Sequence, residues 1–328
     1  MIKQHFFIAA FGIALSASNA NAFDCTKAET ASEKAICADP AALAADAALS
    51  DAFKTLRTSL SPSQSAELLK SQQSWVKQRD NNCSESTPAE LAKCLKDQSD
   101  SRAKSFNTKP QAGPGGFGTL VPFFRSEVGG KGKTKVEILV YKFANPSDAA
   151  QKSFNTEIDK MIGDVQQPGA DDSQSDSFDF SLDMSLDYVS PKLISAHTAT
   201  SSYLGGAHPN NQSTTINIDV KKGAVAKFED FLDNTSSTKI AALCTKQILQ
   251  QKKESQGADV DLSEDTLKKL SDDIANANKD LALWTFAADK AEIQYDQYVV
   301  GAYAEGAFSC DITYSDLRPL VKKDFPLP

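Results

Sequence analysis

A histidine on a glycine-rich turn is the residue of this sequence best suited to proton transfer or metal binding. His208 follows Gly205 and Gly206 and precedes Pro209, a composition typical of a tight turn between strands. Catalysis or metal binding by an imidazole requires partners, and beyond residue 22 the only other histidine is His197. No Ser-His-Asp order and no metal-ligand spacing accompanies either residue. We therefore expect no catalytic residue and no metal site. The sequence favours a structural loop histidine, with contact to a partner as the alternative.

Three aspartates on one predicted strand suggest a second kind of chemistry, the attraction of a basic partner. Asp179, Asp183 and Asp187 share one face of a segment in which apolar and polar residues alternate. The ordinary role of such carboxylates is solvation, or pairing with lysines of neighbouring strands. The functional alternative is an acidic strip that steers a basic protein.

Tyrosines near the glycine turn and near the C-terminus could anchor an interface. Tyrosine buries a large area at a small entropy cost, although core packing is an equally common role. The candidate partner-binding residues of the chain are Tyr203, Gly205, Gly206, His208, Pro209, Asp179, Asp183, Asp187, Tyr298 and Tyr303.

The cysteines of the chain indicate disulfides in an oxidising compartment, because their number is even and no C-x-x-C motif is present. A helix between Cys25 and Cys37 would hold these two residues too far apart to bond. Antiparallel helices would return Cys83 towards Cys37, which favours the pairs Cys37–Cys83 and Cys25–Cys94. Direct pairing of Cys83 with Cys94 remains open. We expect the two distant cysteines to join a late helix to the last strand. The six cysteines are Cys25, Cys37, Cys83, Cys94, Cys244 and Cys310.

Composition and charge describe a folded chain with an acidic balance. The 328 residues are 41% hydrophobic and 24% charged, which fits a folded protein long enough for two domains. The 35 Lys+Arg against 43 Asp+Glu give a net charge of −8, which argues against general nucleic-acid binding. Most of this charge lies late in the sequence: residues 23–108 hold 11 basic and 12 acidic groups, and residues 109–328 hold 23 and 31.

The first 22 residues have the pattern of a cleaved secretory signal. Lys3 precedes an apolar run from Phe6 to Leu15, and Ala20-Asn21-Ala22 fits a signal-peptidase site. The apolar run is too short for a comfortable membrane span, and no later segment is apolar enough for one. We therefore predict an exported, periplasmic or secreted protein without a stable membrane span.

The elements that would position these residues fall into two predicted domains. Residues 23–106 show helical periodicity with capping signals at Ser61-Pro62-Ser63-Gln64 and at Pro88, and so predict a small disulfide-linked all-α bundle. Residues 107–118 are rich in Pro and Gly and predict a linker.

For residues 119–328 we predict an α+β domain with a mainly antiparallel sheet. Its expected elements are strands at 135–143, 178–188, 193–204, 214–220, 281–287, 291–295 and 308–314, and helices at 147–161, 238–254 and 263–279.

The helical domain resembles the N-terminal domain of the LprI-type lysozyme inhibitors. The residues that carry this resemblance span nearly the whole domain, and Phe53 stands where a tyrosine is expected. They are Cys25, Ala28, Thr30, Glu33, Ile36, Cys37, Leu43, Asp46, Leu49, Leu56, Gln73, Trp75, Arg79, Cys83, Cys94, Leu95 and Arg102.

The second domain resembles the extracellular lysozyme-binding domain of the anti-sigma factor RsiV, which is also found in the deacetylase PdaC. One block runs from Tyr203 to Asn210 and continues at Phe228-x-Asp230-Phe231-Leu232; the other runs from Tyr298 to Gly306 and continues at Ile312-x-Tyr314-x-x-Leu317. No transmembrane, sigma-binding or deacetylase part accompanies these blocks, so those roles do not transfer.

The two resemblances together imply a non-enzymatic protein of the bacterial envelope that binds and inhibits a basic, lysozyme-like partner without a cofactor. One alternative is a module that binds peptidoglycan or another envelope glycan. A second alternative is an accessory protein to an envelope hydrolase or deacetylase.

Overall fold

The computed structural model describes residues 24–84, 87–106, 111–112, 117–129, 134–163, 178–256 and 263–328. The predicted signal at 1–22 lies outside the described residues, as do 107–110 and 113–116 of the predicted linker. The chain forms two compact units, one from the residues up to Lys54 with Arg79–Lys104, and one from Thr55–Gln78 with Ser105–Pro328. No helix among the described residues is both long and apolar enough to cross a membrane.

The N-terminal region is helical, as the periodicity predicts. Its helices are α1 (Ala31–Ala38), α2 (Pro40–Ser59), α3 (Pro62–Cys83) and α4 (Pro88–Phe106), after a short 3₁₀ turn η1 (Cys25–Lys27). The predicted capping box at the start of α3 is present: Gln64 N donates to Ser61 Oγ (3.4 Å) and Ser61 N donates to Gln64 Oε1 (3.2 Å).

The first unit is held by a small apolar cluster and two local disulfides. Ile36, Cys83 and Leu95 are buried together. The bonds join Cys25 to Cys37 and Cys83 to Cys94, with Cα atoms 5.7 and 5.8 Å apart. Our favoured pairs Cys37–Cys83 and Cys25–Cys94 are therefore wrong, and the alternative Cys83–Cys94 is correct.

The error has a physical cause in the position of helix α1. We assumed that one helix separates Cys25 from Cys37, but α1 begins only at Ala31. Cys25 lies in η1, and the extended residues Ala28 and Thr30 separate this turn from α1. The segment between the two cysteines is therefore not one continuous helix, and their Cα atoms lie 5.7 Å apart. Likewise, α3 ends at Cys83 and Cys94 is on the second turn of α4, so a short connection brings these two together.

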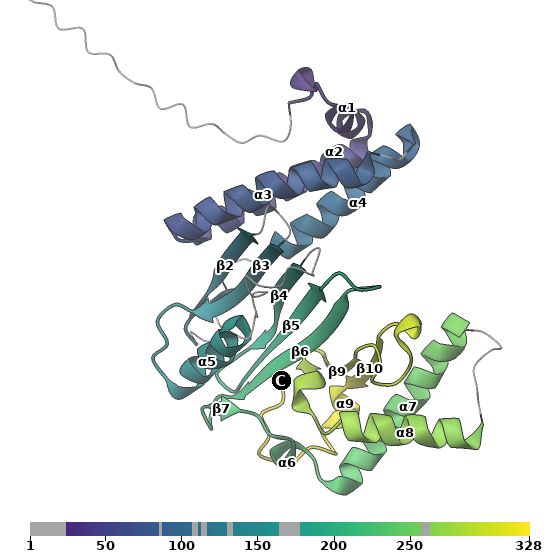
Figure 1. The fold of residues 1–328 in the computed structure, drawn as a ribbon. Helices are drawn as coiled ribbons and strands as arrows, with labels where there is room; N and C mark the ends of the chain where they lie inside the picture. Colours follow the sequence, from purple (N-terminus) through teal and green to yellow (C-terminus); the bar gives the residue numbers. More distant parts are fainter. Residues whose placement is uncertain are drawn as a thin grey trace, which may run out of the picture. The chain divides into compact units, whose positions relative to one another are not determined.

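The second unit is built on a seven-stranded sheet whose strands follow each other in chain order. All neighbours are antiparallel except β3 and β4, which are parallel and are joined through α5 (Ala149–Gly163). Helix α5 covers one face of the sheet, where Phe154 and Ile158 enter the core (Figure 1). The α+β prediction is confirmed. The strands are β1 (Gln111–Ala112), β2 (Thr119–Gly129), β3 (Thr134–Phe143), β4 (Phe178–Val189), β5 (Leu193–Tyr203), β6 (Asn210–Asp219) and β7 (Ala224–Val225).

Strand β2 is missing from the sequence-based assignment. Pro122 interrupts its apolar run, and proline normally counts against a strand. In the structure Pro122 pairs with Tyr141 on β3 and lies beyond the two residues of β2 that pair with β1.

A bulge in β4 breaks the predicted alternation. The pairing of β4 with β5 shifts between Leu186 and Tyr188, which leaves Asp187 as the extra residue. Leu186 packs against the core under α5, whereas Tyr188 packs against the core on the opposite side of the sheet. The regular alternation predicted for this segment therefore ends at the bulge, beyond which the apolar side chains lie on the other face of the sheet.

A second layer covers the other face of the sheet. It contains a three-stranded antiparallel sheet in the order β10 (Phe308–Thr313), β9 (Lys290–Tyr295), β8 (Trp284–Phe286). Helices α7 (Asn234–Gln256) and α8 (Glu264–Ala277) flank it, and the short helices α6 (Phe228–Phe231) and α9 (Tyr314–Leu317) complete this part (Figure 1). The predicted link between a late helix and the last strand is confirmed, since Cys244 of α7 bonds to Cys310 of β10.

Buried polar side chains join the two sheets. Asn217 of β6 donates through Nδ2 to the carbonyl oxygens of Leu281 (2.8 Å) and Trp284 (2.7 Å). On β5, Ser195 Oγ accepts from Phe286 N at 3.0 Å. Because buried polar groups are costly unless they are paired, these contacts fix how the second layer sits on the first.

The outer edge of β10 is paired with side chains of α7 instead of another strand. Gln251 donates to Ser309 O (2.7 Å) and accepts from Ser309 N (3.3 Å). One helical turn earlier, Gln247 makes the same two contacts with Asp311, at 2.7 and 3.0 Å. A helical turn rises about as far as two strand residues, which lets the two glutamines match the strand repeat.

Candidate functional site: an exposed aromatic surface

Two of the sequence blocks singled out above meet in the second unit. The connection between β5 and β6 carries His208 and Pro209, and the connection between β9 and β10 carries Tyr298 and Tyr303. Tyr303 Oη donates to the carbonyl oxygen of Pro209 at 2.9 Å. The imidazole of His208 stacks on the ring of Tyr303, with centroids 3.6 Å apart and planes inclined by 19°.

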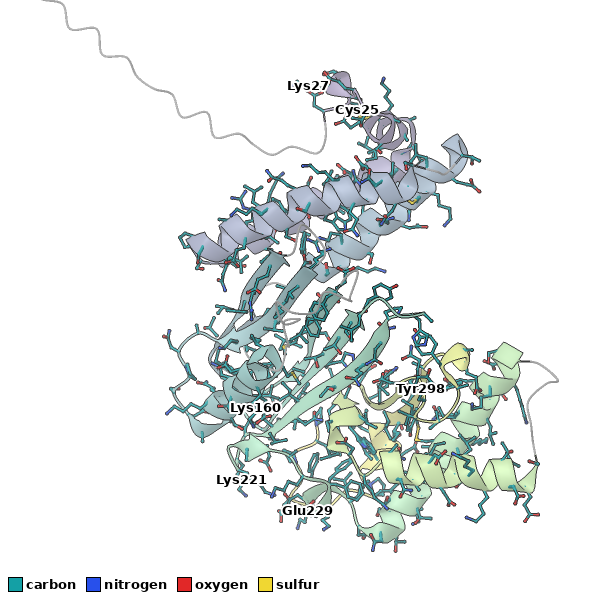
Figure 2. All side chains as sticks on the ribbon, in the orientation of Figure 1. Cys25, Lys27, Lys160, Lys221, Glu229 and Tyr298 are labelled. Atoms are coloured by element: carbon teal, nitrogen blue, oxygen red, sulfur yellow. A yellow bond between two sulfur atoms is a disulfide. The ribbon has the colours of Figure 1, made fainter. Side chains whose placement is uncertain are left out.

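Tyr298 extends this stack towards solvent. Its ring centroid is 5.7 Å from that of Tyr303, and the residue is 68% exposed. Figure 2 labels its position on the ribbon. Tyr298 has φ 71°, the only positive φ of a non-glycine residue in the described chain. Such a backbone is uncommon for a large side chain and is found mostly where the surroundings enforce it. We call His208, Tyr298 and Tyr303 the aromatic surface.

The aromatic surface has an apolar neighbour on the glycine turn. Leu204 is 66% exposed. Gly205 has φ +82°, a conformation that L side chains rarely adopt, so this turn requires a glycine. Leu204 and Tyr298 are thus both among the exposed large hydrophobic residues of the described chain.

Backbone contacts fix the orientation of both loops. His208 Nδ1 lies 3.0 Å from Pro209 O, and because a carbonyl only accepts, Nδ1 carries the proton in this contact. Asp296 Oδ2 accepts from Ser213 N at 2.6 Å, which attaches the β9–β10 connection to β6. The arrangement presents rigid ring faces to solvent, and rings of this kind suit recognition because little entropy is lost on binding.

The three predicted aspartates are not part of the aromatic surface. Asp179 is exposed and pairs with Tyr203 across β4 and β5, while Asp183 is half-buried. Asp187 is half-buried at the bulge, where Oδ2 accepts from His197 N at 2.9 Å. Burial raises the pKa of the Asp187 carboxyl, against the lowering effect of its hydrogen bond from His197. Asp187 is therefore a bulge-stabilising residue and does not belong to an open acidic strip.

Sequence reasoning missed a groove beside the aromatic surface. It is a cavity of about 680 Å³ between α7, α8 and residues 298–305, and Lys252 and Glu305 are among the residues that line it. Gly301, which lines the groove, is the residue whose type could have pointed to it from the sequence. An added Cβ there would come within 2.7 Å of Glu305 Oε1 and 2.8 Å of Lys252 Nζ, so a larger residue at this position would displace the ends of both charged side chains.

Within the ranges that the structure covers, no group of three or more histidine, cysteine, aspartate or glutamate side chains could hold a metal ion. The aromatic surface itself is held by ring contacts among its three members and by the hydrogen bond from Tyr303 to Pro209.

The comparisons with known proteins identify two regions. Residues 25–106 match the family model described as lysozyme inhibitor LprI. This confirms the resemblance predicted for the helical region. Residues 229–315 match a family described as a protein of unknown function, DUF3298. This second match contains Tyr298 and Tyr303 and both long helices of the groove.

Several solved structures are similar to the chain, among them two of the DUF3298 family. A member of the DUF3298 family from Bacteroides fragilis is 13% identical, with TM-score 0.46, over 62% of this chain and 94% of the other. A DUF3298 family protein from Pseudomonas aeruginosa is 14% identical, with TM-score 0.42, over 64% of this chain and 96% of the other. No curated protein matches the chain significantly.

Proposed function

We propose that this protein is an exported, non-catalytic binding protein of the bacterial envelope that inhibits lysozyme by forming a stoichiometric complex. The observation that carries the proposal is the match of residues 25–106 to the lysozyme inhibitor LprI model. Three disulfides and no free cysteine are consistent with an oxidising compartment.

The aromatic surface is the proposed contact region of the second unit. Hot spots of protein interfaces are enriched in tyrosine and lie where aromatic side chains can be fully desolvated. Tyr298 is largely exposed and rests on the His208–Tyr303 stack, so a partner can bury it with little rearrangement. Residues 23–328, the predicted exported chain, hold 34 basic and 43 acidic groups, and this net charge of −9 favours encounter with a basic enzyme.

Titration of the purified exported protein into a basic c-type lysozyme tests the proposal. Calorimetry should give a defined stoichiometry, and residual muramidase activity should fall in proportion to the complex formed. Absence of binding at micromolar concentration and low salt would contradict the proposal. Retention on insoluble peptidoglycan without lysozyme binding would favour the glycan-binding alternative.

Tyr298→Ala tests whether the aromatic surface takes part. Truncating an interface hot-spot tyrosine costs about 2 kcal/mol or more, which corresponds to at least a roughly 30-fold loss of affinity. Tyr298→Phe keeps the ring and should bind like the unaltered protein, so it is the matched control. Unchanged lysozyme affinity in the alanine variant would place the contact elsewhere, with the LprI-matching region as the next surface to vary.

A further inference from the structure

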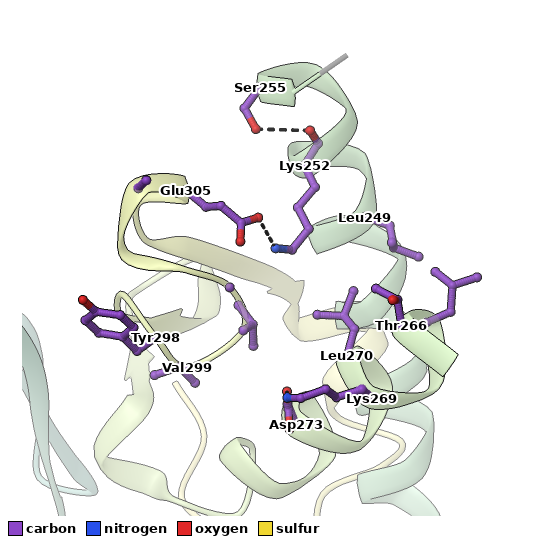
Figure 3. Close-up of a pocket in the computed structure, with 14 residues that line it drawn as sticks. Leu249, Lys252, Ser255, Thr266, Lys269, Leu270, Asp273, Tyr298, Val299 and Glu305 are labelled. Atoms are coloured by element: carbon purple, nitrogen blue, oxygen red, sulfur yellow. Dashed lines mark hydrogen bonds and ion pairs between the residues drawn. The ribbon is translucent and has the colours of Figure 1, made fainter. Parts of the chain in front are cut away.

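The groove of the second unit combines an apolar floor with a charged wall (Figure 3). Leu249 of α7, Leu270 of α8 and Val300 of the β9–β10 connection supply apolar lining. Its volume of about 680 Å³ lies within the range of about 300–1,000 Å³ that is typical of small-molecule sites.

The charged wall is an ion pair that is largely removed from solvent. Lys252 Nζ lies 2.6 Å from Glu305 Oε2, and the two side chains are 10% and 24% exposed. The ammonium also lies 4.6 Å from the ring centroid of Phe308. An ammonium has three N–H donors, so besides Glu305 it can donate to a group in the groove. Glu305 Oε1 accepts from Ala302 N at 2.6 Å, which holds the carboxylate in place.

The charges of the lining cancel in pairs. Lys269, the second lysine of the groove, is paired with Asp273 at 2.5 Å. A paired wall neither attracts nor repels net charge, because each cation is accompanied by an anion. It still offers fixed donors and acceptors, to which Ser255 and Thr266 add hydroxyls. These features fit a neutral ligand with several polar groups and one or more small apolar groups.

From these contacts we infer that the groove binds a short neutral saccharide that bears acetamido groups. The acetamido methyl group matches the apolar floor, its carbonyl oxygen can accept from Lys252, and sugar hydroxyls can donate to Glu305. Tyr298 lies at the edge of the groove, where its exposed ring can contact the C–H face of a further sugar. Saccharide binding in the groove would be a second function of the protein, and it does not depend on lysozyme binding. The groove is thus a candidate location for the envelope-glycan binding considered above as an alternative function.

Calorimetry of the full exported protein with chitotriose is the direct test. We expect saturable binding with one site per chain. Absence of heat and of chemical-shift change at millimolar chitotriose would overturn the inference. A groove that takes the apolar fluorophore anilinonaphthalene sulfonate, with no displacement by chitotriose, would also overturn it, because the site would then select apolar and not saccharide ligands.

Filling the groove with a large side chain locates the binding. Ala304 is exposed and lines the groove, whereas Ala307 is exposed in the same connection and does not line it. Ala304→Trp should reduce chitotriose affinity at least tenfold, and Ala307→Trp should leave it unchanged. Thr266→Trp fills the groove from α8 and provides a second variant if Ala304→Trp unfolds. Undiminished chitotriose binding in folded forms of both filling variants would overturn the assignment to this groove.

Lysozyme titration of the same variants separates the two proposals. Ala304→Trp and Thr266→Trp substitute no residue of the aromatic surface, so lysozyme binding should persist in at least one of them when saccharide binding is lost. Failure of lysozyme binding in every variant and in the unaltered protein would contradict the proposed function, while the chitotriose result would still decide the saccharide site.

Discussion

The carbonyl oxygen of Pro209 accepts from both His208 Nδ1 and Tyr303 Oη, at 3.0 and 2.9 Å. One acceptor thus holds two rings that come from different loops. Loops usually place functional side chains with less accuracy than helices or strands do. Here the hydrogen bonds of both rings to the same backbone carbonyl fix the positions of the two side chains.

Asp187 gives a prediction about pH at the scale of a single residue. The folded state raises the pKa of its carboxyl above the ordinary value of 3.8, because burial disfavours the carboxylate, and the nearby Glu292 adds to the effect. The folded state therefore binds a proton more tightly than the unfolded state does. The contribution of Asp187 to stability is most favourable below pH 3.8 and falls as the pH rises through the folded-state pKa.

Replacing Asp187 with asparagine should remove this dependence. An asparagine Oδ1 can still accept from His197 N, so the bulge contact is retained. The free energy of unfolding of Asp187→Asn, relative to the unaltered protein, should rise between pH 3 and pH 7 in urea titrations. A constant or falling difference over that range would show that the carboxylate is not disfavoured in the folded state.

Residue types alone predicted some members of the site and missed others. The glycine turn and the Tyr-rich block are conspicuous in sequence, and the structure brings His208, Tyr298 and Tyr303 together. The Lys252–Glu305 pair was missed because its members are 53 residues apart and charged pairs occur on every surface. Asp187 was misjudged because a bulge cannot be read from alternation.

At the scale of elements, the two glutamines on α7 protect the edge of β10. An unpaired strand edge is a template for another chain, and proteins generally cover or charge it. Gln247 and Gln251 occupy four backbone groups of β10 with their amides. We expect these hydrogen bonds to stabilise the second unit and to prevent the edge of β10 from pairing with another chain.

The double variant Gln247→Ala/Gln251→Ala should lower the free energy of unfolding by about 1–3 kcal/mol, because hydrogen bonds of this kind contribute about 0.5–1.5 kcal/mol each and these are partly exposed. Gln250→Ala is the matched control, since Gln250 is exposed on the same helix and pairs with Glu254. Urea unfolding gives the energies, and light scattering at high concentration reports association. Equal stability of the double variant and the control would contradict this role.

The disulfides make a second prediction at this scale. Cys244–Cys310 closes a separation of 66 residues and lies in the core, whereas Cys25–Cys37 closes 12. The chain-entropy model gives a larger stabilisation for the longer loop, within about 2–5 kcal/mol. Cys244→Ser/Cys310→Ser should therefore lower the free energy of unfolding of the second unit. This decrease should exceed the decrease that Cys25→Ser/Cys37→Ser causes in the first unit by roughly 1 kcal/mol or more. The fluorescence of the buried Trp284 reports unfolding of the second unit. An equal or larger decrease in the free energy of unfolding on removal of Cys25–Cys37 would contradict the chain-entropy model.

Most elements were predictable, because capping signals and periodicity act locally. Ser61 and Gln64 mark the start of α3 from the sequence alone. Strand order, the parallel β3–β4 pair and the pairing of the second layer depend on contacts between residues far apart. The disulfide error shows the same limit, since it arose from where helix α1 begins and not from the cysteines themselves.

At the scale of the whole molecule, net charge predicts how the proposed association with lysozyme depends on salt. The charge of −9 on residues 23–328 attracts a basic partner over distances that salt screens, with a Debye length of about 10 Å at 0.1 M and about 3 Å at 1 M. The association rate constant should therefore fall at least several-fold between 20 mM and 500 mM salt, while the dissociation rate changes less. Surface plasmon resonance at several salt concentrations checks this. An association rate that does not change with salt would show that long-range charge plays no part.

The order of the disulfides along the chain has a consequence for biogenesis. Each bond joins a cysteine to the next one in sequence: first to second, third to fourth, fifth to sixth. A chain threaded from its N-terminus into an oxidising compartment exposes its thiols in that same order. An oxidase that couples each thiol to the one that emerges next would produce the native set without any bond having to be reshuffled, so maturation of this protein should require an oxidase and no isomerase.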